Sequence, residues 1–338
     1  MGKESNHFHV RQSINFNDWD RFIIDHPNGN IFQSPHMFKV YKKTKNHKPI
    51  FVAVVNEKEE LCGVLLAVVQ SEHKGILGVF SSRSIIMGGP LIKNDDQFVM
   101  GIILKAYTDE IKSKVIFSEI RNLHNCRDQS DIFCKANFIY DPHLDILINL
   151  KKKEEELMNS IQKNKKRNYT KSTNKGVCFK EVNDEKELQE GFKLINSTYD
   201  RVKLPKPADN LFICAIELLS PNFIKVFGAY SDSKIIGIRI ILTYKKMIYD
   251  WYAGSDNESR NMYPNDFLIL KILLWGGSNH FSIFDFGGAG KPNVPYGVRD
   301  HKMKFGGELV EFGRYIKIHN RMLYKIGLFG LQVLKILK

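Results

Sequence analysis

The chain has 338 residues, of which 43% are hydrophobic and 12% aromatic, a composition that provides for two domains and excludes a mostly disordered protein. The formal net charge of +13 predicts an anionic partner, which is a nucleic acid, a phosphorylated small molecule or an acidic membrane face. No apolar run reaches the roughly 18 residues of a transmembrane helix, and the first residues lack the apolar core of a secretory signal.

The cysteines and histidines form no disulfide or metal pattern. No two of the five cysteines have the C-x-x-C spacing, and an odd number argues against a disulfide framework. The eleven histidines include no H-x-x-x-H pair. We therefore expect a protein of the reducing cytoplasm with no metal and no bound cofactor.

The first part of the chain, residues 10–148, alternates between strand and helix patterns. Helices are expected at Asn17–Ile24 and, with apolar residues at helical spacing, at Phe98–Ile111. Gly88-Gly89-Pro90 predicts a bend beside an apolar run. The expected strands are Ile50–Val55, Cys62–Val69, Ile76–Phe80, Val115–Ile120 and Asp145–Leu150. We assign residues 1–150 to a first domain.

A strongly basic segment follows. Three lysines and three glutamates at Lys151–Glu156 open a helix that we expect to continue to about Tyr169. The cations that follow, with no acid among them, are Lys163, Lys165, Lys166, Arg167, Lys171 and Lys175. Such a strip can bind a phosphate backbone, because each neutralised phosphate releases counterions. The alternative is that it is only the solvated face of a helix.

From Val177 the alternation of strands and helices starts again. A helix begins after Asp184, which forms a capping box with Glu187. The other expected elements are the strands Val177–Val182, Ile224–Tyr230, Ile235–Tyr244, Met247–Ala253, Ser282–Phe286 and Glu308–Ile318 and the helices Ala208–Leu219 and Pro264–Trp275. We assign residues 151–320 to a second domain and residues 321–338 to a C-terminal amphipathic helix. Both halves run strand, strand, strand, helix, strand, so we predict an α/β fold with mixed sheets and an internal duplication.

Candidate site residues gather in the second half. In the strand around Tyr249-Asp250-Trp251-Tyr252, alternation would place residues 249 and 251 on one face and residues 250 and 252 on the other, either toward a ligand or within a core. The strand that contains Asp285 ends in Gly287-Gly288, where a ligand can approach the backbone closely. Asp285 needs a partner if it is buried, and Lys302 is a cation that can meet developing negative charge. The alternative is a packed strand with an ordered turn.

Arg201 ends a predicted helix, where it is favourable for the helix dipole alone. Taken in chain order, however, these segments resemble the Fem family of aminoacyl-tRNA-dependent transferases, which build the interpeptide bridges of peptidoglycan. The matching residues are Phe32-Gln33-Ser34, Arg167, Thr198-x-x-Arg201, Tyr249-x-Trp251-x-x-Gly254-Ser255, Phe284-Asp285-Phe286-Gly287-Gly288 and Lys302-x-x-Phe305-Gly306-Gly307-Glu308. The chain departs from the family where His301 precedes the lysine, where Arg121-Asn122 replaces an Asp-Pro motif and where Met37 replaces a tryptophan.

The resemblance implies two tandem domains of the GNAT acyltransferase fold without a coiled-coil arm, because Lys151–Gly176 leaves room for one helix. It implies transfer of an amino acid from aminoacyl-tRNA to an amine of a UDP- or lipid-linked peptidoglycan precursor. By the resemblance, Lys302 is the catalytic cation. The residues expected to bind the acceptor are Arg201, Tyr249, Tyr252, Asp285, Gly287 and Gly288, and those expected to bind tRNA are Lys163, Lys165, Lys166 and Arg167. The general base is left open.

Two other functions remain open. An acyl-CoA-dependent N-acyltransferase of surface polysaccharide synthesis would need a loop of the form [RQ]-x-x-G-x-[GA] before a helix, and none precedes Phe98 or Pro264. A basic adaptor without enzymatic activity would bind RNA or an anionic membrane. The amphipathic C-terminal helix favours peripheral membrane contact, although it can also pack on the protein itself. We expect a monomer in the cytoplasm, or at the inner face of the membrane if the acceptor is lipid-linked.

Overall fold

The structure, a computed structural model, describes residues 7–71, 82–203 and 206–327. The chain forms two compact units, Met1–Pro142 with Phe312–Lys338, and His143–Glu311. The domain boundaries expected from the sequence, at residues 150 and 320, stay predictions. The predicted strand Ile76–Phe80 lies outside the described residues, as does most of the predicted C-terminal helix, of which residues 321–327 are described and helical.

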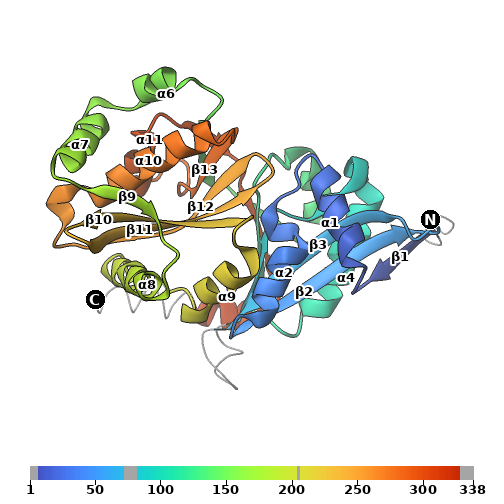
Figure 1. Cartoon of the computed structure of the whole chain (residues 1–338). Helices are drawn as coiled ribbons and strands as arrows, with labels where there is room; N and C mark the ends of the chain where they lie inside the picture. Colours follow the sequence, from blue (N-terminus) through green and yellow to red (C-terminus); the bar gives the residue numbers. More distant parts are fainter. Residues whose placement is uncertain (1–6, 72–81, 204–205, 328–338) are drawn as a thin grey trace. The chain divides into compact units, whose positions relative to one another are not determined.

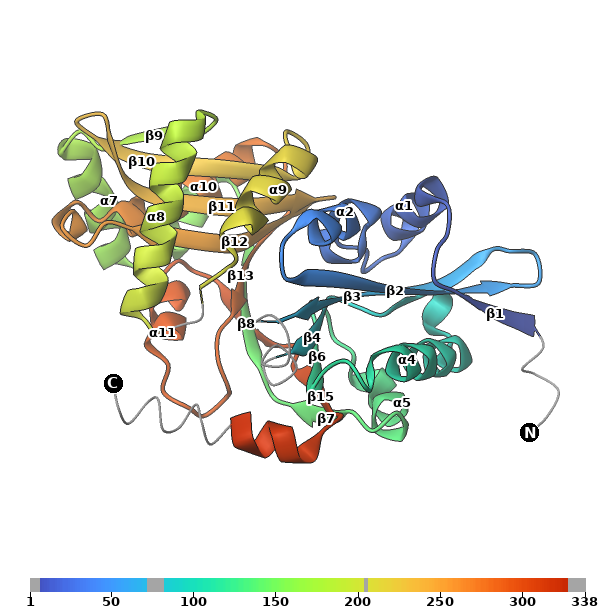
Figure 2. The same cartoon turned by 90° about the horizontal axis from the view of Figure 1, so that it is seen from below.

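The first unit is built on an eight-stranded mixed sheet. Its strand order is β1 (Phe8–Arg11), β2 (His47–Asn56), β3 (Leu61–Gln70), β4 (Arg83–Met87), β6 (Phe117–Arg121), β15 (Arg314–Ile318) and β7 (Ile139–Asp141), and β5 (Leu91–Ile92) pairs with β3. Only β4 and β6 are parallel. The helices α1 (Phe16–Asp25) and α2 (Pro35–Lys43) lie on one face, and α4 (Gln97–Ile111) and α5 (Ser130–Lys135) lie on the other (Figure 1, Figure 2).

The second unit is built on a seven-stranded mixed sheet. Its order is β14 (Glu308–Glu311), β8 (Leu144–Asn149), β13 (Ile283–Gly288), β12 (Met247–Ser255), β11 (Lys234–Tyr244), β10 (Ile224–Ser231) and β9 (Cys178–Glu181). The helices α8 (Glu185–Arg201) and α9 (Asp209–Leu219) cover one face. The opposite face carries α10 (Pro264–Ser278), with α6 (Glu154–Ser160) and α7 (Lys163–Asn174) beyond it and α11 (Gly297–Met303) beside it (Figure 1).

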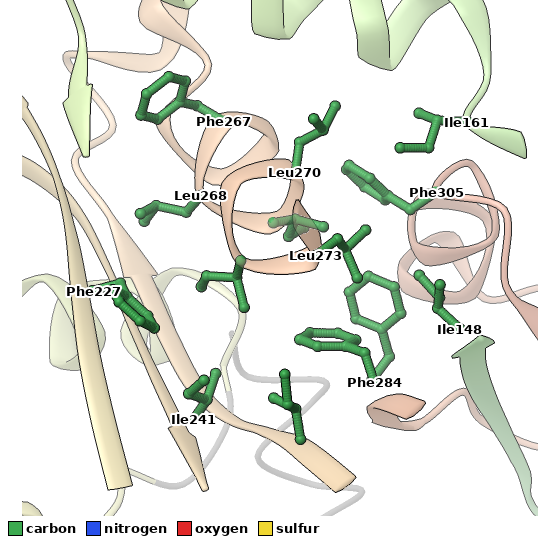
Figure 3. Packing of buried hydrophobic residues seen from close by; sticks show 14 of the residues in the cluster. Ile148, Ile161, Phe227, Ile241, Phe267, Leu268, Leu270, Leu273, Phe284 and Phe305 are labelled. Carbon is green, nitrogen blue, oxygen red and sulfur yellow. The ribbon is translucent and has the colours of Figure 1, made fainter. Parts of the chain in front are cut away.

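The core of the second unit surrounds α10. This helix is apolar on all sides, because it lies between the sheet and α7. Phe227 and Ile241 of the sheet face Leu268 on one side, and Ile161 and Phe305 lie on the other (Figure 3). Each such side chain contributes about 1.5–3 kcal/mol when fully buried. The packing fixes α10, and therefore the position of its N-terminus.

Two predicted elements are divided in the structure. The helix expected to run from Lys151 to Tyr169 is interrupted at Ile161, whose backbone is extended because its side chain turns into the core. The strand expected at Glu308–Ile318 is wrong as a single strand, since β14 belongs to one sheet and β15 to the other. Gly313 between them has φ +69°, outside the β region. Within the described residues, no helix combines the length and apolar character needed to cross a bilayer.

Candidate functional site in the second unit

The centre of the second sheet opens where β12 and β13 part. These parallel strands pair at only three positions, Met247 with Ile283, Ile248 with Phe284 and Tyr249 with Asp285. Beyond them, β12 continues to Ser255 while paired with β11 alone. Because backbone polar groups in a protein interior need partners, the main chain along this opening must be satisfied by side chains, by water or by a ligand.

Asp285 lies at the start of the opening. It is only 2% exposed, and one of its carboxylate oxygens accepts a hydrogen bond from the backbone N–H of Gly287 at 2.7 Å. Gly287 has φ +67°, a left-handed conformation that glycine adopts without strain. Burial raises the pKa of the Asp285 carboxyl to about 6, although the Gly287 N–H and the charge of Lys302 both act to lower it. The Gly287 N–H is thus the direct partner of this buried carboxyl group.

Lys302, in the last turn of α11, points into the end of β13. Its ammonium donates to three successive carbonyl oxygens, those of Phe286 at 2.7 Å, Gly287 at 3.4 Å and Gly288 at 3.0 Å. Burial lowers the pKa of the Lys302 amine, while the carboxylates of Asp250 and Asp145 raise it. Lys302 is therefore a fixed and largely desolvated cation at the opening, where it can stabilise negative charge on a bound group.

Asp250 directly follows Tyr249, the last residue of β12 that pairs with β13. Its carboxylate forms an ion pair with Arg239 of β11, whose side chain is 4% exposed. A second nitrogen of the same guanidinium donates to the side-chain oxygen of Asn265 in the first turn of α10. The ion pair therefore connects the opening between the strands to the N-terminus of α10.

A bulge in β12 overturns the expected alternation of residues 249–252. The register with β11 shifts so that Tyr252 opposes Ile240 and Asp250 opposes Ile241, which leaves Trp251 as an extra residue. As a result, Trp251 and Tyr252 both contact Phe212 of α9, with ring centroids 6.1 and 4.8 Å apart. The two aromatic side chains therefore reach the same helix rather than opposite faces.

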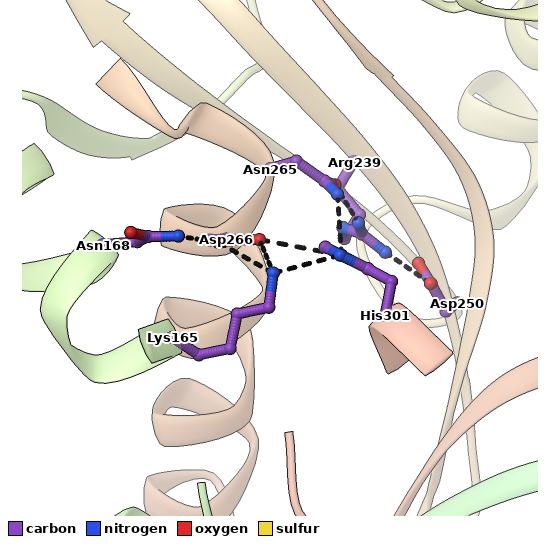
Figure 4. Close-up of polar contacts among 7 residues, drawn as sticks. All are labelled: Lys165, Asn168, Arg239, Asp250, Asn265, Asp266 and His301. Carbon is purple, nitrogen blue, oxygen red and sulfur yellow. Dashed lines mark hydrogen bonds and ion pairs between the residues drawn. The ribbon is translucent and has the colours of Figure 1, made fainter. Parts of the chain in front are cut away.

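A buried polar network occupies the first turn of α10 (Figure 4). Lys165 of α7 donates to both carboxylate oxygens of Asp266, at 2.8 and 2.9 Å, and Asn168 donates to the same carboxylate at 2.7 Å. The Lys165 ammonium also lies 3.0 Å from Nδ1 of His301, which must accept because an ammonium only donates. Burial, followed by the charge of Lys165, lowers the pKa of His301 to about 4, so its ring is neutral at pH 7.

A pocket of about 490 Å³ lies beside this network. Its wall includes Arg201, Arg260, Tyr263 and His301. Both arginines are exposed, and neither forms an ion pair with any carboxylate that the structure describes. Tyr263 precedes α10 with φ +51° and provides no side-chain cap. The pocket therefore presents two guanidinium groups, which can pair with phosphate oxygens of a ligand.

The end of α8 is joined to the end of β12. The hydroxyl group of Thr198 accepts from the backbone N–H of Ser255 at 3.2 Å and from Arg201 at 3.3 Å. A side chain at Gly254 would meet backbone atoms of Leu194 and Ile195 within about 2.5 Å, a distance that no methyl group tolerates. Glycine at 254 and threonine at 198 therefore hold Arg201 at the rim of the pocket.

The basic helix α7 divides its cations between two environments. Lys163 and Arg167 are exposed and Lys166 is half-buried, whereas Lys165 is 6% exposed and ion-paired. The expectation that Lys165 faces an RNA backbone is corrected here, because its ammonium is occupied by Asp266. The other three cations stay predicted RNA contacts.

Several solved structures are similar to this chain in fold. FemX is similar with a TM-score of 0.73 at 15% identity, covering 94% of this chain and 99% of that chain. A tandem GNAT protein from the clavulanic acid biosynthesis pathway has a TM-score of 0.60 at 7% identity, covering 93% and 99%. The C-terminal domain of a protein described as a lysylphosphatidylglycerol synthetase from Agrobacterium fabrum has a TM-score of 0.54 at 14% identity, covering 94% and 95%. No curated protein sequence matches the chain significantly.

A family model described as an acetyltransferase (GNAT) domain matches residues 162–303, which include every residue of the opening and of the α10 network. The chain therefore has the tandem GNAT fold, and its second unit contains a GNAT acetyltransferase domain. The predicted tandem GNAT fold and the mixed α/β class are thereby confirmed, and the family match over residues 162–303 supports the predicted acyltransferase class.

The two GNAT-like units differ at the corresponding parallel strands. In the first unit β4 pairs with β6 along its whole length, and the backbone N–H of Gly88 adds a further bond to Arg121. The N-terminus of α4 is capped by Asp96, which accepts from the backbone N–H groups of Phe98 and Val99. The first unit therefore has neither an open strand pair nor an uncapped helix at these positions, which favours the second unit as the site of chemistry.

The Phe32-Gln33-Ser34 motif has a structural role in the first unit, where Gln33 bonds to the backbone of two strands. The Gln33 amide nitrogen donates to the carbonyl oxygens of Leu66 and Met87, at 2.9 and 2.8 Å, and its oxygen accepts from the backbone of Leu66. Gln33 is fully buried. Its amide group provides the hydrogen-bond partners that the buried backbone groups of Leu66 and Met87 need.

The structure brings Lys302, Asp285, Gly287 and Gly288 together at the opening, whereas Arg201 lines the neighbouring pocket. Tyr249 is buried at the last paired position. Arg239, Asn265 and Asp266 are not among the residues predicted from the sequence. A signal was present for two of them, because Arg239 is the only charge in the apolar run of β11 and Asp266 is the only acid in α10.

Proposed function

We propose that the chain transfers an aminoacyl group from aminoacyl-tRNA to an amine of a phosphorylated or lipid-linked cell-wall precursor peptide. The observation that carries this proposal is the buried Lys165–Asp266 pair in the first turn of α10. An acyl-CoA enzyme would need free backbone N–H groups at this helix end to hold the pyrophosphate. Asp266 places a carboxylate at the third helical position, and Lys165 is fully engaged in balancing its charge, so the cation at this helix end is not free to bind a pyrophosphate. The proposal therefore assigns a donor other than CoA.

The likeness to FemX and to a protein described as a lysylphosphatidylglycerol synthetase supports aminoacyl-tRNA as that donor. The exposed Lys163 and Arg167, with the half-buried Lys166, supply cations for a tRNA backbone. Phosphate contacts of this kind position a nucleic acid without reading its sequence. Arg201 and Arg260 would hold phosphate groups of the acceptor in the neighbouring pocket, where planar donors pair well with phosphate oxygens.

The chemistry requires alignment and charge stabilisation rather than a protein nucleophile. The acceptor amine attacks the ester carbonyl carbon, the new C–N bond forms, and the ester C–O bond breaks to release the tRNA hydroxyl group. Holding the two substrates together can contribute about 7–11 kcal/mol. The Lys302 ammonium would stabilise the tetrahedral oxyanion, a role in which a well-placed donor contributes about 2.7–4 kcal/mol.

We place this reaction in the cytoplasm, where the C-terminal residues 321–338 would bring a monomeric enzyme to the inner face of the membrane. The apolar and basic residues of that segment in the sequence are the ground for this part of the proposal. Binding of the full chain to anionic vesicles, compared with a chain ending at residue 327, tests it.

The deciding experiment offers the protein radiolabelled aminoacyl-tRNA and radiolabelled acetyl-CoA in parallel, each with UDP-linked and lipid-linked precursor peptides. Transfer of label from aminoacyl-tRNA to a precursor supports the proposal. Transfer from acetyl-CoA alone supports the second candidate, an acyl-CoA-dependent N-acyltransferase, which the match to an acetyltransferase family model favours. If neither precursor accepts the label, hydroxylamine is offered as a small acceptor. Release of label above the rate without enzyme then shows which donor the protein uses.

A further inference from the structure

Asp250 keeps one carboxylate oxygen in the interior without a hydrogen-bond donor. Oδ2 is paired with Arg239, whereas Oδ1 is buried and has no hydrogen-bond partner among the residues that the structure describes. The side chain is 9% exposed. A buried carboxylate oxygen has lost its water and is unfavourable until a donor replaces it. Oδ1 is therefore suited to an N–H or O–H group that comes from outside the protein.

The position of Asp250 connects this oxygen to the proposed chemistry. It is the first residue of β12 beyond the segment that pairs with β13, so it borders the opening where the ammonium group of Lys302 lies. The two groups are within electrostatic reach, because the Asp250 carboxylate is the strongest of the charges that raise the pKa of Lys302. The two terminal nitrogens of Arg239 donate to Oδ2 of Asp250 and to Asn265, and its Nε has no partner among the described residues, so the guanidinium leaves Oδ1 without a donor in this geometry.

We propose that Oδ1 of Asp250 binds the amino group of the acyl acceptor and takes its proton as the amide bond forms. This inference rests on the proposed function in one respect, that the acceptor is an amine. The amine nitrogen bonds to the acyl carbon while the ester C–O bond breaks, its proton moves to Asp250, and Asp250 passes that proton to the leaving oxygen. The carboxylate is regenerated, and no additional reactant is consumed.

The surroundings of Asp250 favour an amine over other acceptors. A carboxylate only accepts hydrogen bonds, and its charge repels carboxylate and phosphate ligands. The charged and titratable groups that face it are Arg239 from β11, Lys302 from α11, Asp285 from β13 and Tyr199 from α8. Lys302 and Asp250 then have separate roles. The ammonium stabilises the charge on the carbonyl oxygen, and the carboxylate accepts the proton of the attacking nitrogen.

A binding experiment tests this site without any acyl donor. The full chain is labelled with ¹³C at the aspartate carboxyl carbons and titrated with Nα-acetyl-L-lysine amide, and Nα,Nε-diacetyl-L-lysine amide is the control ligand that lacks the free amine. We expect one carboxyl resonance to shift with the free amine only, and we expect that response to be absent from Asp250→Asn. Glu181→Gln is the matched control, because it removes a carboxylate of the same unit from the exposed ion pair with Lys225, and it should respond like the wild type.

Kinetics separate this inference from the proposed function. With whichever donor is consumed, Asp250→Asn should lower kcat by about 10²–10⁴-fold, while Asp250→Glu recovers part of the rate. The asparagine can still accept from Arg239 but leaves a buried guanidinium charge without its counterion, so Asp250→Asn should be less stable than the wild type. Unfolding curves establish that it is folded under the assay conditions, and Asp250→Glu, which keeps the charge, should be closer to the wild type in stability. An amine response that persists in Asp250→Asn, or an unchanged kcat, overturns the inference even if transfer is observed. An amine response without transfer from any donor supports the site and rejects the proposed donor.

Discussion

Lys165 and Asp266 lie 101 residues apart in the chain, yet the ammonium of one donates to both carboxylate oxygens of the other. The pair joins α7 to the first turn of α10 and is almost wholly buried. It places a carboxylate and its balancing cation at the end of the helix where an anionic ligand could meet backbone N–H groups. The same ion pair therefore fixes the basic helix α7 against α10 and bears on which acyl donor the protein accepts.

Replacing Lys165 with methionine should destabilise the protein by about 3–5 kcal/mol, because Asp266 would be left as a buried charge without its cation. Urea unfolding at pH 7 measures the change. Glu181→Gln, which breaks an exposed pair with Lys225, should cost less than about 1 kcal/mol. Equal losses in the two variants would contradict the structural importance assigned to the buried pair.

Replacing Lys302 with alanine should lower kcat by about 10²–10³-fold if its ammonium stabilises the oxyanion. Folding should be retained, since the carbonyl groups that Lys302 binds lie partly at the surface. Lys304→Ala removes a neighbouring charge for which the structure shows no side-chain partner and should leave turnover unchanged. Undiminished transfer by the Lys302 variant would remove this residue from the mechanism.

Reversing the charges of Lys163, Lys166 and Arg167 to glutamate should weaken tRNA binding. Each lost phosphate contact should also reduce the slope of log K against log salt by about 0.7–0.9. Filter binding at several salt concentrations gives both quantities. Reversal of Lys105, Lys112 and Lys114 to glutamate, in and just after α4 of the first unit, is the control with the same change in net charge. Binding that changes equally in both proteins would identify α7 as an ordinary solvated helix.

Asp285 should make the protein less stable as the pH rises from about 4 to about 6. Its pKa is about 6 in the folded protein and 3.8 without burial, so the folded state holds the extra proton through this range. The free energy of unfolding therefore falls by up to about 3 kcal/mol on passing through it. Asp285→Asn should lack this component, which urea unfolding at pH 4 and pH 7 will show. An identical pH dependence in variant and wild type would be the contrary result.

His301 should act in the opposite direction. Its pKa falls from 6.5 to about 4 on folding, so the unfolded chain binds the proton first and the folded state loses stability as the pH falls from about 6.5 to about 4. His301→Gln keeps an acceptor for Lys165 but cannot be protonated, so it should be less sensitive to acid than the wild type. Thermal unfolding across this range, with His280→Gln as an exposed control, measures the difference.

Much of the fold was accessible from residue patterns. Apolar periodicity predicted α4 at Phe98–Ile111, where the structure has Gln97–Ile111, and the capping box at Asp184 predicted the start of α8. These predictions succeeded because local spacing determines which face of an element is apolar. They failed where a distant partner decides, as at Ile161, whose side chain leaves the helix pattern for the core.

The candidate site shows the same division. The strand ending in Gly287-Gly288, the following Lys302 and the basic run of α7 are visible as residue types in order. That β12 parts from β13 after Tyr249, and that a bulge turns Trp251 and Tyr252 to the same helix, depend on the register between strands. Register is a property of the assembled sheet, because each strand must match neighbours from elsewhere in the chain.

By itself, the sequence determined the two-part α/β architecture, the excess of positive charge and the presence of a lysine after a Gly-Gly strand end, since each follows from composition or from short-range spacing. Only the tertiary structure decided that Lys165 faces inward to Asp266, that Arg239 pairs with Asp250 and that Asp250 keeps an oxygen for another donor. The physical reason is that a charge is placed by what surrounds it, and those surroundings come from strands and helices remote in the chain.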